Sequence, residues 1–539
     1  MAGTTSGSDF ATGMGAPRGV FTRASSGLVR QVGSGDVLFY GWGQITLGFI
    51  IFTIAAWQFY PGASMEVAVV LALVGGLAMG VVYALLTTIY PRSGGEYVFL
   101  SRAIHPLVGF VASLSFAFWE IFYSGIVAAF LSIFGLAPLF GTLGLQLHNT
   151  GLTNVGTWFG EAQGIFITGA VVIIVMSFLI YRGLGRYFRI QRWGMWVVAG
   201  SLVLTVIVLA LAASGALSFK HNFDALAGAG AYAKVVADGI KAGAVYHPAF
   251  SLTSTIEFMI WPAFSIWFAV ASVSFSGEVK NVQRGQLLGI SGAMVTMGVA
   301  SVLLMFFSRA AFGNQFLIGA PAVPAAHFPV PLPPYINSFA GIAGGNPILT
   351  VLMSLWVIGT MVFDIGATLI YGNRAILAWS LDGVAPERLG RVSERFHSPT
   401  WAIGAAAVVA LIWLGLYAFT SLLAILSGFM GLAVTFMLVC VGGILFPFVK
   451  RRVFDASPIA FKLGSLPVIT VLGAVGLVFT AYVFVRLFFD SAFGSNKPFP
   501  IWMAVAVVVG AAVWLYGARA YRKSHGVDID RRFKEIPIE

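Results

Sequence analysis

Two acidic residues stand in long apolar stretches of the sequence, where charge is rare. They are Glu120, within Phe-Trp-Glu-Ile-Phe, and Asp364, within Val-Phe-Asp-Ile-Gly. At the centre of a bilayer an ionised side chain costs about 2.5–3.5 kcal/mol on insertion scales, so both are functional candidates by default. A buried carboxyl can carry a proton, and an ionised one can bind sodium or pair with a cationic substrate. The alternative is structural: each acid is neutral or hydrogen-bonds a carbonyl freed by a helix interruption.

The composition is typical of a membrane protein. Hydrophobic residues make up 58% of the 539 residues and charged residues 9%, whereas soluble proteins carry about 25% charged residues. The mean hydropathy is +0.91. Because there is one cysteine, Cys440, no internal disulfide is possible.

Twelve stretches are long enough to cross a bilayer, which takes about 20 mostly apolar residues in a helix. They lie at residues 37–57, 66–89, 107–136, 163–181, 193–213, 255–276, 287–312, 347–372, 400–419, 422–448, 467–489 and 500–518. An even number of spans places both termini on the same side of the membrane.

The basic residues predict the orientation. All but six of the 31 Lys and Arg residues fall on one side of the predicted spans; the exceptions are Lys220, Lys234, Lys241, Arg309, Arg486 and Lys497. Since basic loops stay inside the cell, both termini are predicted to be cytoplasmic, in a plasma or inner membrane. The net charge of +11 is therefore topological, and no nucleic-acid partner is expected. The long outside segments at 137–162, 214–254 and 313–346 either cover an extracellular entrance or are surface insertions.

Three polar segments follow predicted spans. Residues 91–97 (PRSGGEY, with Arg102 close behind) follow the second, 276–284 (SGEVKNVQR) the sixth, and 373–386 (NRA…LDGVAP) the eighth. Each taken alone is a polar turn at a helix end. In this order and against twelve spans, they resemble the signatures of the amino acid–polyamine–organocation (APC) transporter superfamily and its amino acid permeases. The resemblance covers essentially residues 30–520.

The resemblance implies an all-α polytopic membrane protein with 12 transmembrane helices and a LeuT-type 5+5 inverted repeat. Helices 1 and 6 of that fold are broken near the midplane, where half-helix amino termini face a substrate carboxylate. The implied divisions are a cytoplasmic tail at 1–35, a first repeat at 36–213, an extracellular loop at 214–254, a second repeat at 255–448, helices 11 and 12 at 449–518, and a cytoplasmic tail at 519–539.

The first and sixth predicted spans contain residues that weaken helices. Residues 41–48 hold three glycines, a glutamine and a threonine in an apolar run, which predicts an interruption there; close helix packing is the alternative for the glycines. In the sixth span, Pro262 cannot donate a backbone hydrogen bond. By family position the sixth span breaks at 264–270, with Phe264 as an aromatic lid over the substrate or else a packing residue.

The resemblance implies a substrate site at these two breaks. Its residues are Gln44, Ile45, Thr46, Leu47, Gly48, Glu120, Ser124, Phe264, Ser265, Ile266, Trp267 and Thr368. Ion or proton coupling is assigned first to Asp364, with Gly43 and Glu120 as further candidates. Some proton-coupled relatives use a lysine of helix 5 instead. Val198 stands at that position, so the lysine mechanism is not expected here.

These features predict a secondary active transporter that moves an amino acid by alternating access, as a proton symporter rather than a sodium-coupled one. Alternatives of the same fold are an amino acid exchanger and a carrier of polyamines or cationic amines, whose ammonium groups would pair with Glu120 and Asp364. A non-transporting sensor is less favoured because neither predicted tail is long enough for a signalling domain. Neither a cofactor nor a metal is expected, and no enzyme, because the predicted spans lack clustered histidine or cysteine ligands.

Overall fold

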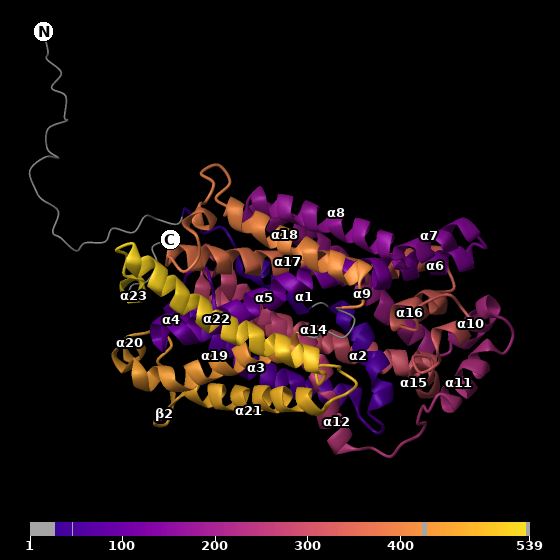
Figure 1. Ribbon diagram of the computed structural model, residues 1–539. Coiled ribbons are helices and arrows are strands. Elements are labelled where there is room, and N and C mark those ends of the chain that lie inside the picture. The colour runs from indigo at the N-terminus through magenta and orange to yellow at the C-terminus, as the bar shows by residue number, and fades with distance from the viewer. Residues whose placement is uncertain (1–26, 46, 423–427, 535–539) are drawn as a thin grey trace, which may run out of the picture.

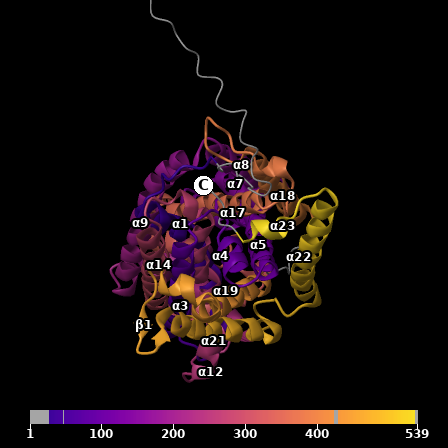
Figure 2. The ribbon, with the colours of Figure 1, turned by 90° about the vertical axis from the view of Figure 1, so that its left-hand side faces the viewer.

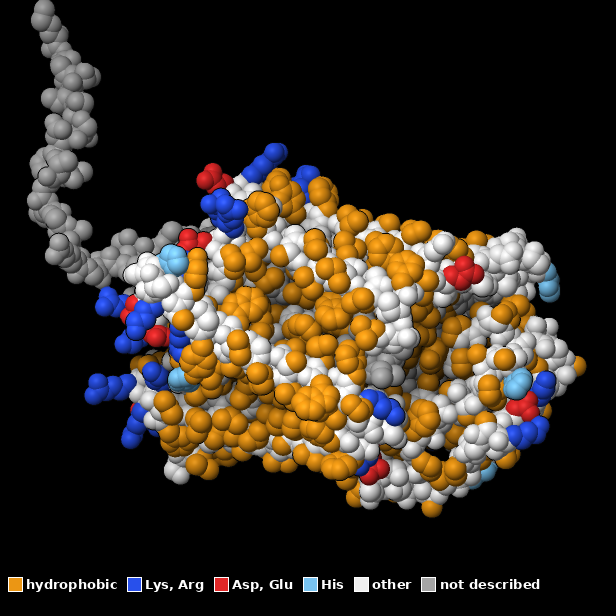
Figure 3. Space-filling model, viewed as in Figure 1, with side chains coloured by type: hydrophobic (Ala, Val, Ile, Leu, Met, Phe, Trp, Pro, Cys, Tyr) orange, Lys and Arg blue, Asp and Glu red, His pale blue; other side chains and the backbone are white. Residues whose placement is uncertain are grey.

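The computed structural model describes residues 27–45, 47–422 and 428–534. In that part of the chain, twelve helices are long and apolar enough to cross a membrane. They run roughly along the long axis of the molecule, and the face in view is covered largely by hydrophobic side chains (Figure 1; Figure 3). The prediction of an all-α, multi-pass membrane protein is confirmed.

Nine spans are single helices among the described residues. They are α3 (Met65–Ile89), α8 (Ala162–Tyr181), α9 (Leu184–Ala213), α14 (Val282–Phe312), α17 (Pro347–Leu381), α18 (Thr400–Phe419), α19 (Phe429–Val449), α21 (Val468–Phe489) and α22 (Pro498–Ser524). The third span is α5 (Pro106–Phe130), which continues through a π-helical turn, η3 (Leu131–Leu136), into α6 (Ala137–Gln146). The third and eighth spans end farther along the chain than predicted, and the fifth begins nine residues earlier, at Leu184 rather than at 193.

Polar side chains set several of these starts. Ser64, Asn281 and Asn346 precede α3, α14 and α17, and each accepts a hydrogen bond from a backbone N–H of the first turn. Such caps satisfy donors that a helix leaves unpaired, so they determine where the apolar run begins to coil.

The shorter elements lie at the two ends of the bundle (Figure 1). At one end are α4 (Glu96–Ala103), η6 (Glu387–Gly390), α20 (Arg451–Asp455), α23 (Ile529–Arg532) and an antiparallel pair, β1 (Lys462–Leu463) with β2 (Leu466–Pro467). At the other are α7 (Thr150–Gly160), α10 (Phe219–Ala227), α11 (Ala231–Lys241), α15 (Asn314–Gly319), η5 (Ala325–His327) and α16 (Ile336–Gly344).

Lys and Arg side chains gather at the first of these ends (Figure 3). We call it the basic end; it comprises the segments at residues 90–105, 181–192, 276–284, 382–398, 450–467 and 519–534. The three long segments predicted outside fold into short helices at the opposite end, and the stretch from Pro321 to Pro334 forms no α-helix there.

The first span is interrupted where the glycines and glutamine predicted it. The helix α1 (Ser34–Ile45) ends before Thr46, which lies outside the described residues, and a 3-10 turn, η1 (Leu47–Phe49), follows. Regular α-helix resumes in α2 (Ile50–Ala56) and ends in η2 (Trp57–Phe59).

The sixth span is irregular at two places. It consists of α12 (Leu252–Phe258), α13 (Ile260–Ile266) and a long 3-10 segment, η4 (Trp267–Glu278). A proline ring clashes with the carbonyl four residues earlier, and for Pro262 that residue is Phe258, where α12 ends. The change to 3-10 geometry at Trp267 falls within the predicted break at 264–270.

The interrupted spans occupy the interior of the bundle. Seen from the basic end, α1 and α17 lie inside, whereas α21 and α22 lie at the periphery (Figure 2). In its most apolar window the sixth span has 94% of its residues buried, against 22% for α22. The irregular backbone is therefore enclosed by protein, as it must be at membrane depth.

Candidate functional site

A small cavity lies between the two interrupted spans. Its volume is about 10 Å³, so its walls nearly touch. The lining residues come from four spans: Gln44, Ile45 and Phe49 of the first, Tyr123 and Val127 of the third, Phe264, Ser265 and Phe268 of the sixth, and Asp364 and Thr368 of the eighth. We call this space the central cavity.

Six residues predicted from the sequence line the central cavity: Gln44, Ile45, Phe264, Ser265, Asp364 and Thr368. Six others lie nearby without lining it: Gly43, Gly48, Glu120, Ser124, Ile266 and Trp267. Among these, the indole of Trp267 points away into α3 and donates to the carbonyl of Ala72 at 2.8 Å. Thr46 and the side chain of Leu47 lie outside the described part of the chain.

Ser265 joins the two interruptions directly. Its hydroxyl donates to the carbonyl oxygen of Ile45 at 2.6 Å. Ile45 is the last residue of α1, and carbonyls in the last turn of a helix have no partner within the helix. The hydroxyl therefore satisfies a group that the interruption exposes, and it fixes the sixth span against the first.

Glu120 faces the first span from the middle of α5. Its Oε2 accepts a hydrogen bond from Nε2 of Gln44 at 2.9 Å, and the same nitrogen lies 3.1 Å from the hydroxyl of Tyr40. The Tyr40 hydroxyl in turn donates to the carbonyl of Ala367 on α17 at 2.9 Å. Within the described residues Oε1 of Glu120 is buried without a partner. Gln44 thus stands between Glu120 and the central cavity.

Asp364 lies at the cavity wall on α17, and its side chain is nearly buried. One turn later, Thr368 donates to the backbone carbonyl of Asp364 at 2.9 Å and accepts from Ser124 at 2.7 Å. Gly43 of the first span faces this stretch, since a Cβ built there would be in ordinary contact with the carbonyl oxygen of Phe363, at 3.5 Å. The backbone of α1 therefore runs beside Asp364.

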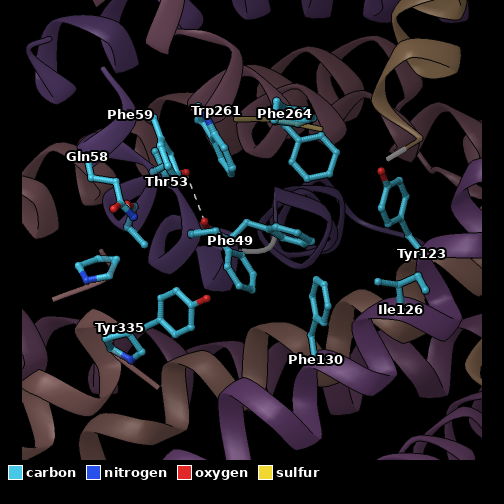
Figure 4. A pocket seen from close by; sticks show the side chains of 16 residues that line it. Phe49, Thr53, Gln58, Phe59, Tyr123, Ile126, Phe130, Trp261, Phe264 and Tyr335 are labelled. Carbon is cyan, nitrogen blue, oxygen red and sulfur yellow. Dashed lines mark hydrogen bonds between the residues drawn. The ribbon is translucent and has the colours of Figure 1, made fainter. Parts of the chain in front are cut away.

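A second, larger cavity opens toward the end opposite the basic end. Its volume is about 420 Å³, and its walls are mostly aromatic (Figure 4). We call this larger cavity the vestibule. Phe49, Tyr123 and Phe264 line both the vestibule and the central cavity. Their rings pack edge to face, with centroids 5.2 Å apart for Phe49 and Phe264 and 5.7 Å for Tyr123 and Phe264. These three residues form an aromatic partition between the two spaces.

Comparison with known proteins assigns the chain to a family. The sequence matches the amino acid permease family over residues 35–512. The chain belongs to this family. It is also 24% identical over 467 residues to the branched-chain amino acid permease BcaP of Lactococcus lactis subsp. cremoris. The aligned region covers 84% of this chain and 86% of the relative. The protein is therefore an amino acid permease of the APC superfamily, a transporter, as the resemblance implied.

The three polar segments of this permease meet at the basic end. Arg374 binds Glu278 through two contacts, Nε to Oε1 at 3.0 Å and Nη2 to Oε2 at 3.3 Å, and neither side chain is exposed. Arg102 binds Asp382 at 2.7 Å, also buried. The first and second polar segments thus each form one ion pair with the third.

Gly94 joins the first polar segment to the sixth span through a backbone hydrogen bond. It donates to the carbonyl of Ser274 at 2.7 Å with a φ of +109°, and a Cβ would stand 2.4 Å from the Cβ of Ala378. Glycine is needed here both for the backbone angle and for the close approach. The segment before the first span is attached as well, since Gln31 donates its backbone N–H to the carbonyl of Glu278 at 2.9 Å.

Glu96, in the first polar segment, is a further buried carboxylate. Its Oε1 accepts a hydrogen bond from the hydroxyl of Tyr371, while Oε2 is buried without a partner among the described residues. Burial raises the pKa of Glu96 from 4.5 to about 7, although the Tyr371 hydrogen bond acts in the opposite direction. The group can therefore change its protonation state near neutral pH.

Several cavity residues were not predicted. Tyr123 and Val127 follow Glu120 by three and seven positions, and helical periodicity puts these positions on one face, so the signal was present around a residue already identified. Phe268 lies four positions after Phe264. Phe49 follows the interruption, where no helical period carries across. In the described part of the chain no three His, Cys, Asp or Glu residues are grouped to hold a metal.

Proposed function

We propose that this permease carries a zwitterionic amino acid with an apolar side chain across the cell membrane by alternating access, coupled to protons through Asp364. The observation that carries the proposal is the central cavity: two interrupted spans and one carboxylate meet there, and most of the other walls are apolar or aromatic. Both termini are assigned to the cytoplasm, because the basic end is the end that a cell keeps inside.

The substrate class follows from the chemistry of the walls. Ile45, Val127 and Phe268 offer apolar surface to a side chain. The ends of the interrupted helices provide backbone amides for a carboxylate and carbonyls for an ammonium group, as in transporters with broken helices. The name of the relative, a branched-chain amino acid permease, agrees with an apolar substrate.

The arrangement of the interruptions supports a LeuT-type inverted repeat. The first and sixth spans are five positions apart, as are the third and eighth, which carry Glu120 and Asp364. A repeat of five spans would place each pair in equivalent positions. On this assignment the eleventh and twelfth spans, α21 and α22, lie outside the repeats, which agrees with the peripheral location of both helices.

The two sides of the central cavity differ in a way that fits one state of a transport cycle. A vestibule reaches the aromatic partition from one end, while two buried ion pairs fill the other end. We assign this state as facing the outside, with the aromatic partition closed over the central cavity and the cytoplasmic side closed by the ion pairs. Opening inward would then require Arg374 and Glu278 to separate.

Asp364 is the proposed proton carrier because it is the one acidic side chain that lines the central cavity among the described residues. A lysine-based mechanism is not available, because the residue at position 198 is Val. Val198 is buried and packs closely against α17, since a Cβ added at Gly359 would stand 2.4 Å from its Cγ2. A proton on Asp364 would enter with the substrate and leave on the other side.

Solute counterflow in proteoliposomes tests the substrate class without an imposed ion gradient. Vesicles containing the full-length protein are preloaded in turn with leucine, lysine or spermidine, and accumulation of the labelled compound is measured. We expect accumulation with leucine, and a Phe268→Trp variant, which fills the cavity, should lose it. Accumulation only with lysine or spermidine would replace this proposal with a carrier of cationic amines, in which Asp364 pairs with the substrate.

A further inference from the structure

A hollow at the basic end is lined by an unusual concentration of arginines. It has a volume of about 660 Å³ and lies between the start of α9, the loop between α17 and α18, and the segment that leads into α1. Its basic residues are Arg182, Arg186, Arg189, Arg192 and Arg395. The one carboxylate in its lining, Asp36, is already bound to Arg192 at 2.6 Å. We call this hollow the arginine pocket.

Most of these cations lack a counter-charge. Among the described residues, the side chains of Arg186, Arg189 and Arg395 form no hydrogen bond and no ion pair. Arg182 stacks on Phe178 and Phe396, with its guanidinium carbon 5.5 and 5.4 Å from the ring centres, and its Nε is buried without a partner. Like charges held this close repel one another, so the pocket is complementary to an anion.

The start of α9 adds to the same field. Gly183 caps this 30-residue helix with a φ of +106°, and no side chain accepts from its first-turn amides. The amino terminus of a helix carries about half a positive charge and favours phosphate groups. Arginine guanidinium groups bind phosphate oxygens in a planar, two-pronged manner, which a carboxylate-poor pocket leaves available.

Two exposed tryptophans lie next to the pocket on the same helix. On α9, just beyond Arg189 and Arg192, the side chains of Trp193 and Trp196 are exposed by 71% and 59%. Exposed tryptophans on a spanning helix are typical of the boundary between lipid and water, where the phosphates of lipids lie. Basic pockets between membrane helices on the cytoplasmic side bind acidic headgroups.

We propose that the arginine pocket is a binding site for a phosphate group, carried either by an anionic lipid headgroup or by a free phosphate compound. The bound group would contact arginines from the start of α9 and from the α17–α18 loop, next to Gln31 and Asp36 at the entrance of the first span. It would thereby link three segments that are distant in the sequence.

Binding to the full-length permease tests the proposal. Retention of phosphatidylglycerol against phosphatidylcholine is measured by native mass spectrometry, and binding of labelled inorganic phosphate by equilibrium dialysis. The test variant is Arg186→Gln/Arg189→Gln, which removes two side chains without partners. The matched control, Arg451→Gln/Arg452→Gln, removes the same charge from an exposed helix at the basic end.

Each arginine of the pocket contributes on the order of a five-fold factor in affinity, so the test variant should bind about 25-fold more weakly. The control should bind like the wild type, because Arg451 and Arg452 do not line the pocket. Loss confined to phosphatidylglycerol identifies a lipid headgroup, and loss of inorganic phosphate identifies a soluble ligand. Arg395→Gln, on another segment, provides an independent variant should the first prove unstable. The proposal would be overturned if the wild type bound neither probe, or if the test and control variants lost affinity equally.

Discussion

Gln44 donates from Nε2 to Oε2 of Glu120 at 2.9 Å, which joins the last turn of α1 to the middle of α5. Both residues were expected to face the substrate. In the structure they face each other, and only Gln44 lines the central cavity. Glu120 therefore acts on the site through the position of Gln44, and its substitution should affect folding more than affinity.

Glu120→Gln should bind leucine with an affinity within a few fold of the wild type, because Glu120 does not line the cavity. Glu120→Ala should instead lower the free energy of unfolding by about 1–3 kcal/mol, since it removes the carboxylate that accepts a buried hydrogen bond from Gln44. Binding is measured on purified protein, with Ser124→Ala as a control on the same face of α5. A loss of leucine affinity beyond ten-fold in well-folded Glu120→Gln would show that Glu120 contacts the substrate.

Asp364→Asn should abolish leucine accumulation driven by a pH gradient and leave counterflow largely intact. The amide keeps the size of the carboxyl but cannot exchange a proton. Uptake is measured in proteoliposomes with and without an imposed pH gradient, with Glu66→Gln, an acid near the vestibule end, as control. Gradient-driven accumulation at the wild-type level in Asp364→Asn would exclude this residue as the proton carrier.

Phe264→Ala should connect the vestibule with the central cavity, because Phe264 is shared by both and packs against Phe49 and Tyr123. We expect faster release of bound leucine and a KM raised about ten-fold, since the aromatic contact between Phe264 and the substrate, of about 1–2 kcal/mol, is lost. Phe52→Ala removes a ring that lines only the vestibule and should change KM little. Equal effects of the two substitutions would argue against a partition.

Glu96→Gln should change how thermal stability depends on pH. The pKa of Glu96 is about 7 in the folded protein, above its ordinary value of 4.5, so the folded state holds the proton more tightly than the unfolded state. The free energy of unfolding therefore falls as pH rises from about 4.5 to about 7, by on the order of 3 kcal/mol at most.

Replacing this carboxyl with an amide removes that dependence. Melting temperatures of Glu96→Gln and the wild type should be similar at pH 5, and the variant should be more stable at pH 8. The exposed Glu394→Gln serves as control. A wild-type pH profile in the Glu96 variant would contradict the assignment.

Arg374→Met should destabilise the permease by about 3–5 kcal/mol, because it leaves Glu278 buried and without its cation. The double variant Arg374→Met/Glu278→Leu removes both charges and should recover much of the lost stability. Thermal unfolding of the three proteins in detergent measures this coupling. An additive loss in the double variant would mean that the two side chains contribute independently.

Much of the architecture was predictable because it depends on local composition. Twelve apolar runs predict twelve spans, and the glycines and polar side chains of residues 41–48 predict an interruption. The family signatures likewise appear as short strings. The sequence motifs do not predict that Arg374 binds Glu278 or that Arg102 binds Asp382, since these partners are 96 and 280 positions apart.

The sequence by itself determined the number of spans, the end that carries the basic residues, and the acids placed in apolar surroundings, because each depends on residue type and on spacing along one helix. Only the tertiary structure decided that Asp364 lines the central cavity while Glu120 lies behind Gln44. That difference depends on how each helix is rotated and packed against its neighbours. The rotation results from contacts across the whole bundle, which no single stretch of sequence contains.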